Sequence, residues 1–354
     1  MASLIDLSGL TLNPEEARQV SEAVFEEVYV KGELNNFHYI DTGVKMNMQI
    51  PFYGLLGLVG KASSGCTPNT STEDIDTSQK NWTPVLHDFR LPHCQNDINQ
   101  LFKMWQRSDR ALDTWEDMDR AQMNFIIDRG LDAFNEMLFR LTSFGDTAAA
   151  LVADGGVITA GTDITFFNTI NGLWKQAFAG VSAGSIYRHT ISENGGVSKT
   201  AQMDLGVTAA YDAMKKMHEN IDPRAFSKGN LKFQVTRTLL NNWQSLLEDK
   251  GIANAIFDRA EKGMNKYMFR GIPIEVRQDW DRNIQAYEDN GTTYNLPHRA
   301  ILTPIENIPI GILDEGSMDS MDAFYDKTDK KWYFDAASQF DMKLLEEYRV
   351  AVAY

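Results

Sequence analysis

The chain has 354 residues, 43% of them hydrophobic and 23% charged, so it can bury at least one large core and is not a disordered segment. Its 49 Asp and Glu residues outnumber its 34 Lys and Arg residues, and a net charge of −15 without a basic cluster argues against sequence-specific nucleic-acid binding. The two cysteines, Cys66 and Cys94, argue against a disulfide framework and indicate a reducing intracellular setting.

The sequence contains no pattern of a targeting or membrane-spanning segment. Met1–Asp6 lacks the basic and apolar regions of a signal peptide. The longest apolar run, Ile50–Gly60, has eleven residues, against the roughly 20 that a helix needs to span a bilayer. We therefore expect a protein without a membrane span that stays in the compartment where it is made.

The N-terminal part is predicted to contain a short helix, a loop and an extended segment, in that order. Asn13 and Pro14 are typical of a helix start, and the apolar spacing that follows ends near Lys31-Gly32. Residues 54–76 are first glycine-rich and then small and polar, which indicates a projecting loop. The pattern of Lys80–Leu91 indicates an extended segment.

The longest regular element is predicted between Asp117 and Leu141. Apolar residues recur there at intervals of three and four, which is typical of an amphipathic helix laid along a core. Gly130 lies inside this pattern and should weaken the helix by about 1 kcal/mol relative to alanine. We expect this helix to form the spine of the subunit.

Glycines at 155–156, 161 and 180–184 then predict loops, with a helix over residues 166–178 between them. Val207 to Met217 restores helical spacing, which must end at Asp222-Pro223. Alternation over Leu231–Val235 predicts a strand, and Leu239–Leu247 predicts a second helix. This order of helix, strand and helix indicates an α+β lobe.

The C-terminal part is predicted to supply short strands with no catalytic signature between them. Two of them lie in Tyr267–Val276 and Leu296–Leu302, and a hairpin joins Phe324-Tyr325 to Lys331–Phe334. The chain closes on the apolar run Tyr348–Tyr354. Because chain ends are usually frayed and polar, such an end predicts a terminal strand that completes a sheet.

One motif suggests an enzyme. Gly180-Val181-Ser182-Ala183-Gly184 matches Gly-x-Ser-x-Gly, the turn that exposes the nucleophilic serine of α/β-hydrolases. That motif is meaningful only between a buried strand and a helix, whereas here the preceding residues are predicted helical and Ser185–Gly196 is polar without a helical pattern. A serine hydrolase that uses Ser182 is therefore the weaker alternative.

Other candidate sites are incomplete. Gly54–Lys61 lacks the first glycine and the Ser or Thr of a phosphate-binding loop, because Leu55 and Ala62 stand there. His87, His93 and Cys94 are close in sequence but poorly spaced for one metal ion. The remaining clusters, one acidic and one aromatic, favour a solvated turn and a core or subunit contact: Asp314, Glu315, Asp319 and Asp322; Trp332, Tyr333, Phe334 and Tyr348. We expect no catalytic, cofactor-binding or metal-binding residue.

Four sequence pieces stand out in this order of elements: Lys80-Asn81-Trp82-Thr83-Pro84, Phe167–Trp174, Gly271–Val276, and His298–Leu302 with the terminal strands. Together with the order of elements, they resemble the major capsid protein of tailed double-stranded DNA phages, which has the Hong Kong 97-type fold. They look similar in particular to capsid proteins from phages of Bacteroidetes-type hosts.

The resemblance implies a structural subunit that is not an enzyme and that assembles into hexamers and pentamers of an icosahedral shell around the phage DNA, in the virion. It implies an N-terminal arm over residues 1–40, an extended loop over 41–95, a peripheral domain over 96–200 and 313–354, and an axial domain over 201–312. Tyr354 is then expected in the peripheral sheet. The packaged DNA would be enclosed without sequence-specific binding.

The same resemblance bears on partners. No long scaffolding segment fits before the arm, so we expect a separate scaffolding protein, together with a portal and possible decoration proteins. Assembly is expected in the host cytoplasm. Shell proteins of cellular encapsulating compartments share this fold and are an alternative, and a neck or tail protein that forms a ring is a third.

Overall fold

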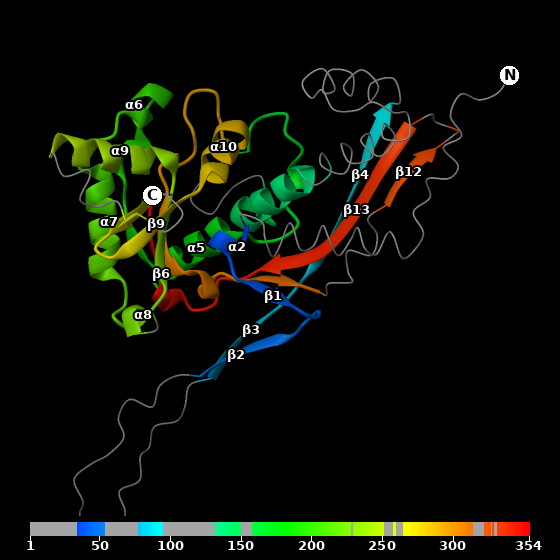
Figure 1. The fold of residues 1–354 in the computed structure, drawn as a ribbon, viewed down its shortest axis with the longest axis horizontal. Helices are drawn as coiled ribbons and strands as arrows, with labels where there is room; N and C mark the ends of the chain where they lie inside the picture. The colour runs from blue at the N-terminus through cyan, green and yellow to red at the C-terminus, as the bar shows by residue number, and fades with distance from the viewer. Residues whose placement is uncertain are drawn as a thin grey trace, which may run out of the picture.

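The structure is a computed structural model that describes residues 34–53, 77–94, 130, 132–149, 158–227, 229–250, 258–259, 265–313, 322–326, 328 and 331–354 (Figure 1). The helical elements are α2 Leu34–Phe37, a helix over 132–144, η3 Ile164–Phe166, α5 Leu173–Ser182, η4 Ser192–Gly195, α6 Lys199–Met203, α7 Ala209–Asn220, α8 Arg224–Ser227, α9 Arg237–Asp249, α10 Gln278–Tyr287, η6 Ile305–Asn307 and η8 Glu347–Arg349. The strands are β1 Ile40–Thr42, β2 Gln49–Tyr53, β3 Thr77–Asn81, β4 Val85–Cys94, β5 Tyr187–His189, β6 Leu231–Val235, β7 Asp258–Arg259, β8 Asn265–Phe269, β9 Ile272–Val276, β10 Ala300–Pro304, β11 Ile310–Ile312, β12 Asp322–Asp326, β13 Lys331–Met342 and β14 Ala351–Ala353.

A seven-stranded mixed sheet in the order β5-β14-β10-β6-β9-β8-β7 forms the centre of the larger lobe. Alternate residues of its central strands enter two different cores, as the pleat requires. Ala300 and Leu302 of β10 join a cluster with α7 and α9, whereas Ile301 between them joins a cluster with α5 and α10. The sheet is therefore covered by helices on both faces.

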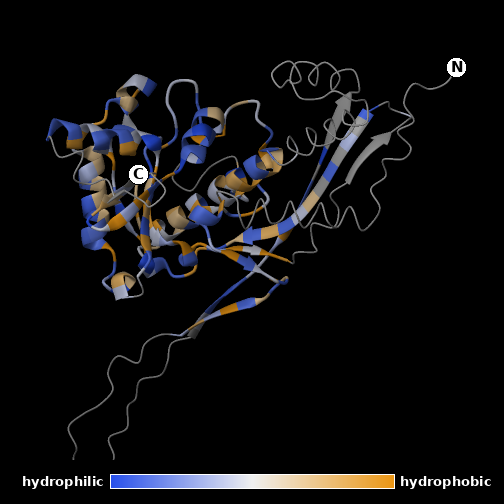
Figure 2. Ribbon diagram, in the orientation of Figure 1, coloured by the Kyte–Doolittle hydropathy of each residue, from blue (hydrophilic) through white to orange (hydrophobic). Residues whose placement is uncertain are grey.

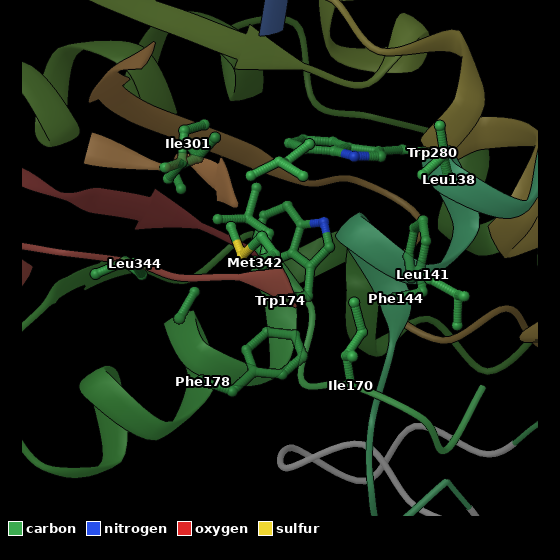
Figure 3. Packing of buried hydrophobic residues seen from close by; sticks show 14 of the residues in the cluster. Leu138, Leu141, Phe144, Ile170, Trp174, Phe178, Trp280, Ile301, Met342 and Leu344 are labelled. Atoms are coloured by element: carbon green, nitrogen blue, oxygen red, sulfur yellow. The ribbon is translucent and has the colours of Figure 1, made fainter. Parts of the chain in front are cut away.

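The second of these clusters also holds the end of the smaller sheet, so one core joins both sheets (Figure 3). Trp174 of α5 lies at its centre and meets Trp280 of α10 edge-on, with ring centroids 4.9 Å apart. Leu138 from the helix over 132–144 and Met342 from β13 pack in the same cluster. The helix, the lobe and the smaller sheet are thus fixed to one another by apolar burial.

The smaller sheet has the order β1-β11-β13-β12, and β4 pairs with the other edge of β13. The ten residues of β4 pair with Lys331–Phe340 of β13, which gives a long ribbon that extends from the lobe (Figure 1). Strands β2 and β3 pair only with each other in the described chain and project in a different direction.

Elements with a clear local period confirm the predictions. Helices α7 and α9 and strand β6 lie where the spacing placed them, β8 and β9 form in the predicted strand region Tyr267–Val276, and β12 with β13 forms the predicted hairpin. The spine helix is helical over 132–144, and thus ends three residues beyond the predicted Leu141; its predicted start lies outside the described residues. The mixed helix and sheet content is that of the predicted α+β class.

The predicted helix over 166–178 is wrong at both ends, since α5 covers Leu173–Ser182. Residues before it pair with the end of the spine helix instead: the amide of Asp146 donates to the carbonyl of Phe167, and that of Gly172 to Gly145. A Cβ at Gly172 would lie 2.6 Å from the carbonyl oxygen of Leu141. This close backbone approach keeps the segment irregular until Gly172 caps the helix.

The terminal strand forms as predicted, but in the other sheet. β14 pairs antiparallel with β10 and parallel with β5, so Tyr354 follows a strand of the seven-stranded sheet and not of the sheet that contains β13. The Tyr354 ring is fully buried against Phe178, with centroids 4.7 Å apart. Burial of Val352 and Tyr354 in the apolar core that joins the two sheets favours this position of the terminal strand.

Several predictions lie outside the described residues: the helix from Asn13 to Gly32, the loop 54–76 with its glycine-rich segment Gly54–Lys61, and the acidic positions 314–321. Among the helices that the structure describes, none has the length and apolar character to cross a membrane.

Candidate functional site

The β2–β3 hairpin projects from the body and exposes alternate residues of β2 (Figure 1). Its register runs from Gln49 opposite Asn81 to Tyr53 opposite Thr77, and apolar residues lie along it (Figure 2). Tyr53 is 74% exposed, and Met48 just before the hairpin is 47% exposed. Because an isolated two-stranded hairpin is at best marginally stable in water, this element needs a further surface to pack on.

The root of this hairpin is clamped by Trp82, whose side chain is only 1% exposed. Its ring lies flat against Gly311 of β11, where an added Cβ would come within 2.8 Å of the ring. The backbone of Trp82 also donates to Met48 and accepts from Asn47, each at 2.9 Å. The hairpin therefore leaves the body at a fixed point.

Two polar contacts beside Trp82 complete this clamp, one with the end of β13 and one with the residues that follow it. The amide of Thr83 donates to the Asp341 carboxylate at 2.8 Å, and Lys343 pairs with the same carboxylate at 2.9 Å. Lys80 donates to the carbonyl of Leu344 at 2.7 Å. The piece Lys80–Pro84, noticed in the sequence for its resemblance, is thus the structural root of the projecting element.

A second polar site joins the N-terminal segment, the spine helix and the lobe around the fully buried Arg277. Its guanidinium binds Asp279 in two parallel hydrogen bonds, at 2.8 and 2.7 Å, and donates to Ser143 at 2.7 Å. It also donates to Gln234 of β6 at 2.8 Å. We call these residues, with His38, the Arg277 junction.

His38 closes this junction from the N-terminal side. Its Nδ1 donates to the carbonyl of Ile308 at 3.0 Å, so its Nε2 is left to accept from Arg277 at 3.2 Å. Burial first, and the charge of Arg277 second, lower the pKa of His38 to about 3. The neutral His38 ring thus connects the N-terminal segment to Ile308 and to Arg277.

A third site lies in the piece His298–Leu302. Arg299 is fully buried, pairs with Glu288 and donates to the carbonyl of Leu296 at 2.9 Å. Burial lowers the pKa of this guanidinium, and Glu288 opposes that shift. His298 lies 2.7 Å from both the carbonyl of Gln202 and the hydroxyl of Thr238. These contacts hold loops onto the sheet and leave no reactive group exposed.

Ser182 does not stand in the context that a hydrolase requires. It is the last residue of α5, and the residues before it are helical, not a buried strand. Gly180 lies inside this helix, so the sequence 180–184 is a helix end with one positive-φ glycine, Gly184. The helix-to-turn geometry contradicts the nucleophile-elbow interpretation.

The candidate metal ligands are also separated. His87 and His93 lie six residues apart on the one strand β4, which places their backbones about 20 Å apart. His87 instead hydrogen-bonds Thr169 at 2.9 Å and stacks on Phe340, with ring centroids 4.3 Å apart. No group of residues suited to hold a metal ion occurs in the part of the chain that the structure describes.

We predict that His87 makes the subunit sensitive to mild acid. Burial lowers the pKa of His87 to about 4, so between pH 6.5 and 4 the unfolded chain binds a proton that the folded chain does not. The free energy of unfolding is therefore not reduced by His87 above pH 6.5, and it decreases as the pH falls below that value. From pH 7 to pH 5 we expect His87 to account for a loss of about 1–2 kcal/mol.

Urea unfolding of the parent and of His87→Gln at both pH values measures this difference. The variant should lose less stability than the parent over that interval. Equal losses in the two proteins would contradict the predicted role of His87.

Sequence reasoning missed the Arg277 junction. The piece Gly271–Val276 was noticed and ends immediately before Arg277, but a lone arginine after a strand carries no local sign of burial. Two aromatic rings lie near it: the ring centroids of Phe37 and Trp280 are 4.5 and 4.8 Å from its guanidinium carbon. Trp280 is close to Arg277 in sequence, but Phe37 lies 240 positions away and reaches it only in the fold.

No protein-family model and no curated protein sequence matches the chain. Solved phage structures are similar to the chain. The capsid of cyanophage P-SCSP1u matches with 13% identity and a TM-score of 0.46, over 91% of this chain and 87% of that one. Gordonia phage Cozz matches with 10% identity and a TM-score of 0.47, over 89% of this chain and 84% of that one. A third is a chain of the satellite phage P4 procapsid including size determination (Sid) protein, with 12% identity and a TM-score of 0.50 over 94% of this chain and 97% of that chain. The chain therefore shares its overall fold with a chain of a phage procapsid.

Proposed function

We propose that this chain is a structural capsid subunit that assembles with copies of itself into hexamers and pentamers of an icosahedral shell enclosing phage double-stranded DNA. The observation that carries the proposal is the likeness in fold to a chain of the P4 procapsid, which spans nearly the whole of both chains. In this proposal the protein performs no catalysis. Its work is to present surfaces to neighbouring copies.

The geometry supports this role at the β2–β3 hairpin. A projecting element with exposed apolar residues, anchored at its root by Trp82 and Lys80, suits contact with another copy better than it suits a lone monomer. We assign this hairpin to the extended loop, which would overlap a neighbour. When every copy makes the same contact with its neighbour and the rotation between copies closes, the result is a closed assembly.

We keep the proposed division into arm (1–40), extended loop (41–95), peripheral domain (96–200 and 313–354) and axial domain (201–312), with one amendment. The strands Tyr187–His189 and Ala351–Ala353 are grouped with the axial sheet, because they pair in it. In this division the long ribbon joins the extended loop, which includes β4, to the peripheral domain, which includes β13.

The proposal includes location and partners. The net charge of −15 supports a shell that encloses DNA without gripping its sequence. A separate scaffolding protein, a portal and decoration proteins are the expected partners, with assembly in the cytoplasm of a Bacteroidetes-type host and the finished protein in the virion.

Negative-stain microscopy of the purified protein, with and without co-expressed scaffold, tests the proposal. Closed shells, rings of five or six copies, or capsomers are the expected particles. A monomer under all assembly conditions would overturn it.

We predict that deletion of Gly65–Asp76 leaves the subunit folded but impairs assembly. The flanks of this loop are already paired, with Tyr53 opposite Thr77, so the hairpin can close without these twelve residues. Far-UV circular dichroism and thermal melting should match the parent, whereas sedimentation should show fewer assembled particles. A variant with a Gly/Ser segment of equal length controls for loop length, and unchanged shells from the deletion would show that the loop assignment is wrong.

A further inference from the structure

The angle at which the β2–β3 hairpin leaves the body is not fixed by Trp82 alone. The buried ring over Gly311 and the neighbouring Thr83–Asp341 bond hold the strand at its root, and a strand held only at its root can still swing about it. A second contact away from that point is needed to select one direction. Lys80, two residues before Trp82 and on the hairpin itself, supplies it.

Lys80 contacts two residues of the segment that joins β13 to β14. Its Nζ donates to the carbonyl of Leu344 at 2.7 Å and to the Glu347 carboxylate at 3.3 Å. The other oxygen of the same carboxylate accepts from the hydroxyl of Ser185, which lies just past the end of α5. Glu347 therefore links the hairpin to the C-terminal end of α5, a helix whose Trp174 and Phe178 belong to the core between the sheets.

The chemistry of Glu347 suits a contact that is specific but can open. Burial opposes ionisation of its carboxyl, but hydrogen bonds from Ser185 and Lys80 and the charge of Lys80 outweigh burial and lower its pKa. The Lys80 and Glu347 side chains are 33% and 36% exposed. An ion pair this exposed contributes little to the stability of the fold, so it can break without unfolding the subunit.

We propose that the chain of contacts Lys80–Glu347–Ser185 is a latch that holds the β2–β3 hairpin at one angle to the body and links that angle to the end of α5. This inference goes beyond the proposed shell function. It concerns the geometry within one subunit, so its test gives a result whether or not the chain assembles.

Distances between two spin labels, measured by pulsed electron resonance on the full-length subunit in dilute solution, test the latch. One label replaces Gln79 on the hairpin and the other replaces Glu248 on α9, both exposed, with Cys66 and Cys94 changed to serine. The parent should give one narrow distance distribution. Lys80→Met and Glu347→Gln should each give a shifted and broader one.

The controls separate the latch from general loosening. Lys232→Met removes a comparable ion pair with Glu275, 3.6 Å long and 21% and 26% exposed, and should leave the distribution narrow. The double variant of Lys80 and Glu347 should be no broader than the broader single one, because both changes break one contact. Thermal melting confirms that each variant is folded.

Ser185→Ala tests the link to α5 and should shift the distribution, although less than Glu347→Gln. A narrow, unshifted distribution in folded Lys80→Met or in folded Glu347→Gln would overturn the latch. Broadening in Lys80→Met alone would do so as well, because it would leave the Leu344 carbonyl as the sole anchor.

Discussion

Replacing Arg277 with alanine is expected to lower the free energy of unfolding by about 3–5 kcal/mol, because the change leaves the buried Asp279 carboxylate without its partner. The same change removes the donors to Ser143 and Gln234, so three segments lose their common contact. Urea or guanidinium unfolding measures the loss. Reduced solubility of the variant would point the same way.

The chain offers a matched control in Arg224. It binds Asp222 through the same two parallel hydrogen bonds and at the same two-residue separation, but its side chain is 54% exposed. Alanine at Arg224 should cost about 0–1 kcal/mol, since solvent screens an exposed pair. If the two variants lost equal stability, burial would not be the source of the effect and the Arg277 junction would not hold the segments together.

Replacing Trp82 with alanine is the second large effect expected, a loss of about 3–5 kcal/mol in the free energy of unfolding. The side chain is 1% exposed and its ring packs directly over Gly311, so its removal leaves a large cavity in the core. Because the Trp82 ring holds the hairpin root against Gly311, and the variant keeps only the backbone bonds to Asn47 and Met48, it should lose assembly even where it still folds. Chemical unfolding and sedimentation measure the two effects.

Tyr53→Ala is the control, since that side chain lies on the same hairpin and is 74% exposed. Its cost to the fold should stay within about 0.5 kcal/mol, as for other surface changes. Gly311→Ala supplies an independent test of the packing of Trp82 on Gly311, because its Cβ would clash with the Trp82 ring at 2.8 Å. A Trp82→Ala variant as stable as the parent would show that the ring does not clamp the hairpin.

The local structure of the lobe was predictable because its elements carry their period in the sequence. In α9, the buried residues Leu239, Leu240, Trp243, Leu246 and Leu247 follow the helical repeat. Alternation in Leu231–Val235 likewise identified a strand. These patterns reflect burial of one face of the helix or strand. The spacing of apolar residues within the segment itself determines which face that is.

Pairing partners were less predictable, since alternation shows which residues are buried but not which strand lies alongside. The terminal strand was assigned to the wrong sheet for this reason. Its residues Ala351 and Val352 enter opposite cores of the seven-stranded sheet, a fact set by β10 and β5. The short strands β1 and β2 were not foreseen at all, because three and five residues carry little period.

For the functional surfaces, too, the sequence identified segments but not their contacts. Residues Lys80–Pro84 were identified from the sequence by their resemblance, but their role as a clamp depends on Gly311 and Asp341, more than 200 positions away. The helix over 166–178 failed because tertiary contacts of Gly172 with Leu141 and Gly145 overrode the local apolar spacing. Contacts between distant segments are what sequence periodicity leaves out.

Cryo-electron microscopy of the assembled protein tests directly whether the proposed subunit builds a shell through its projecting hairpin. We expect closed shells of hexamers and pentamers in which residues Gln49–Tyr53 and Thr77–Asn81 of one copy lie on the surface of the next. Shells in which this hairpin contacts only its own subunit, or no closed assembly at all, would contradict it.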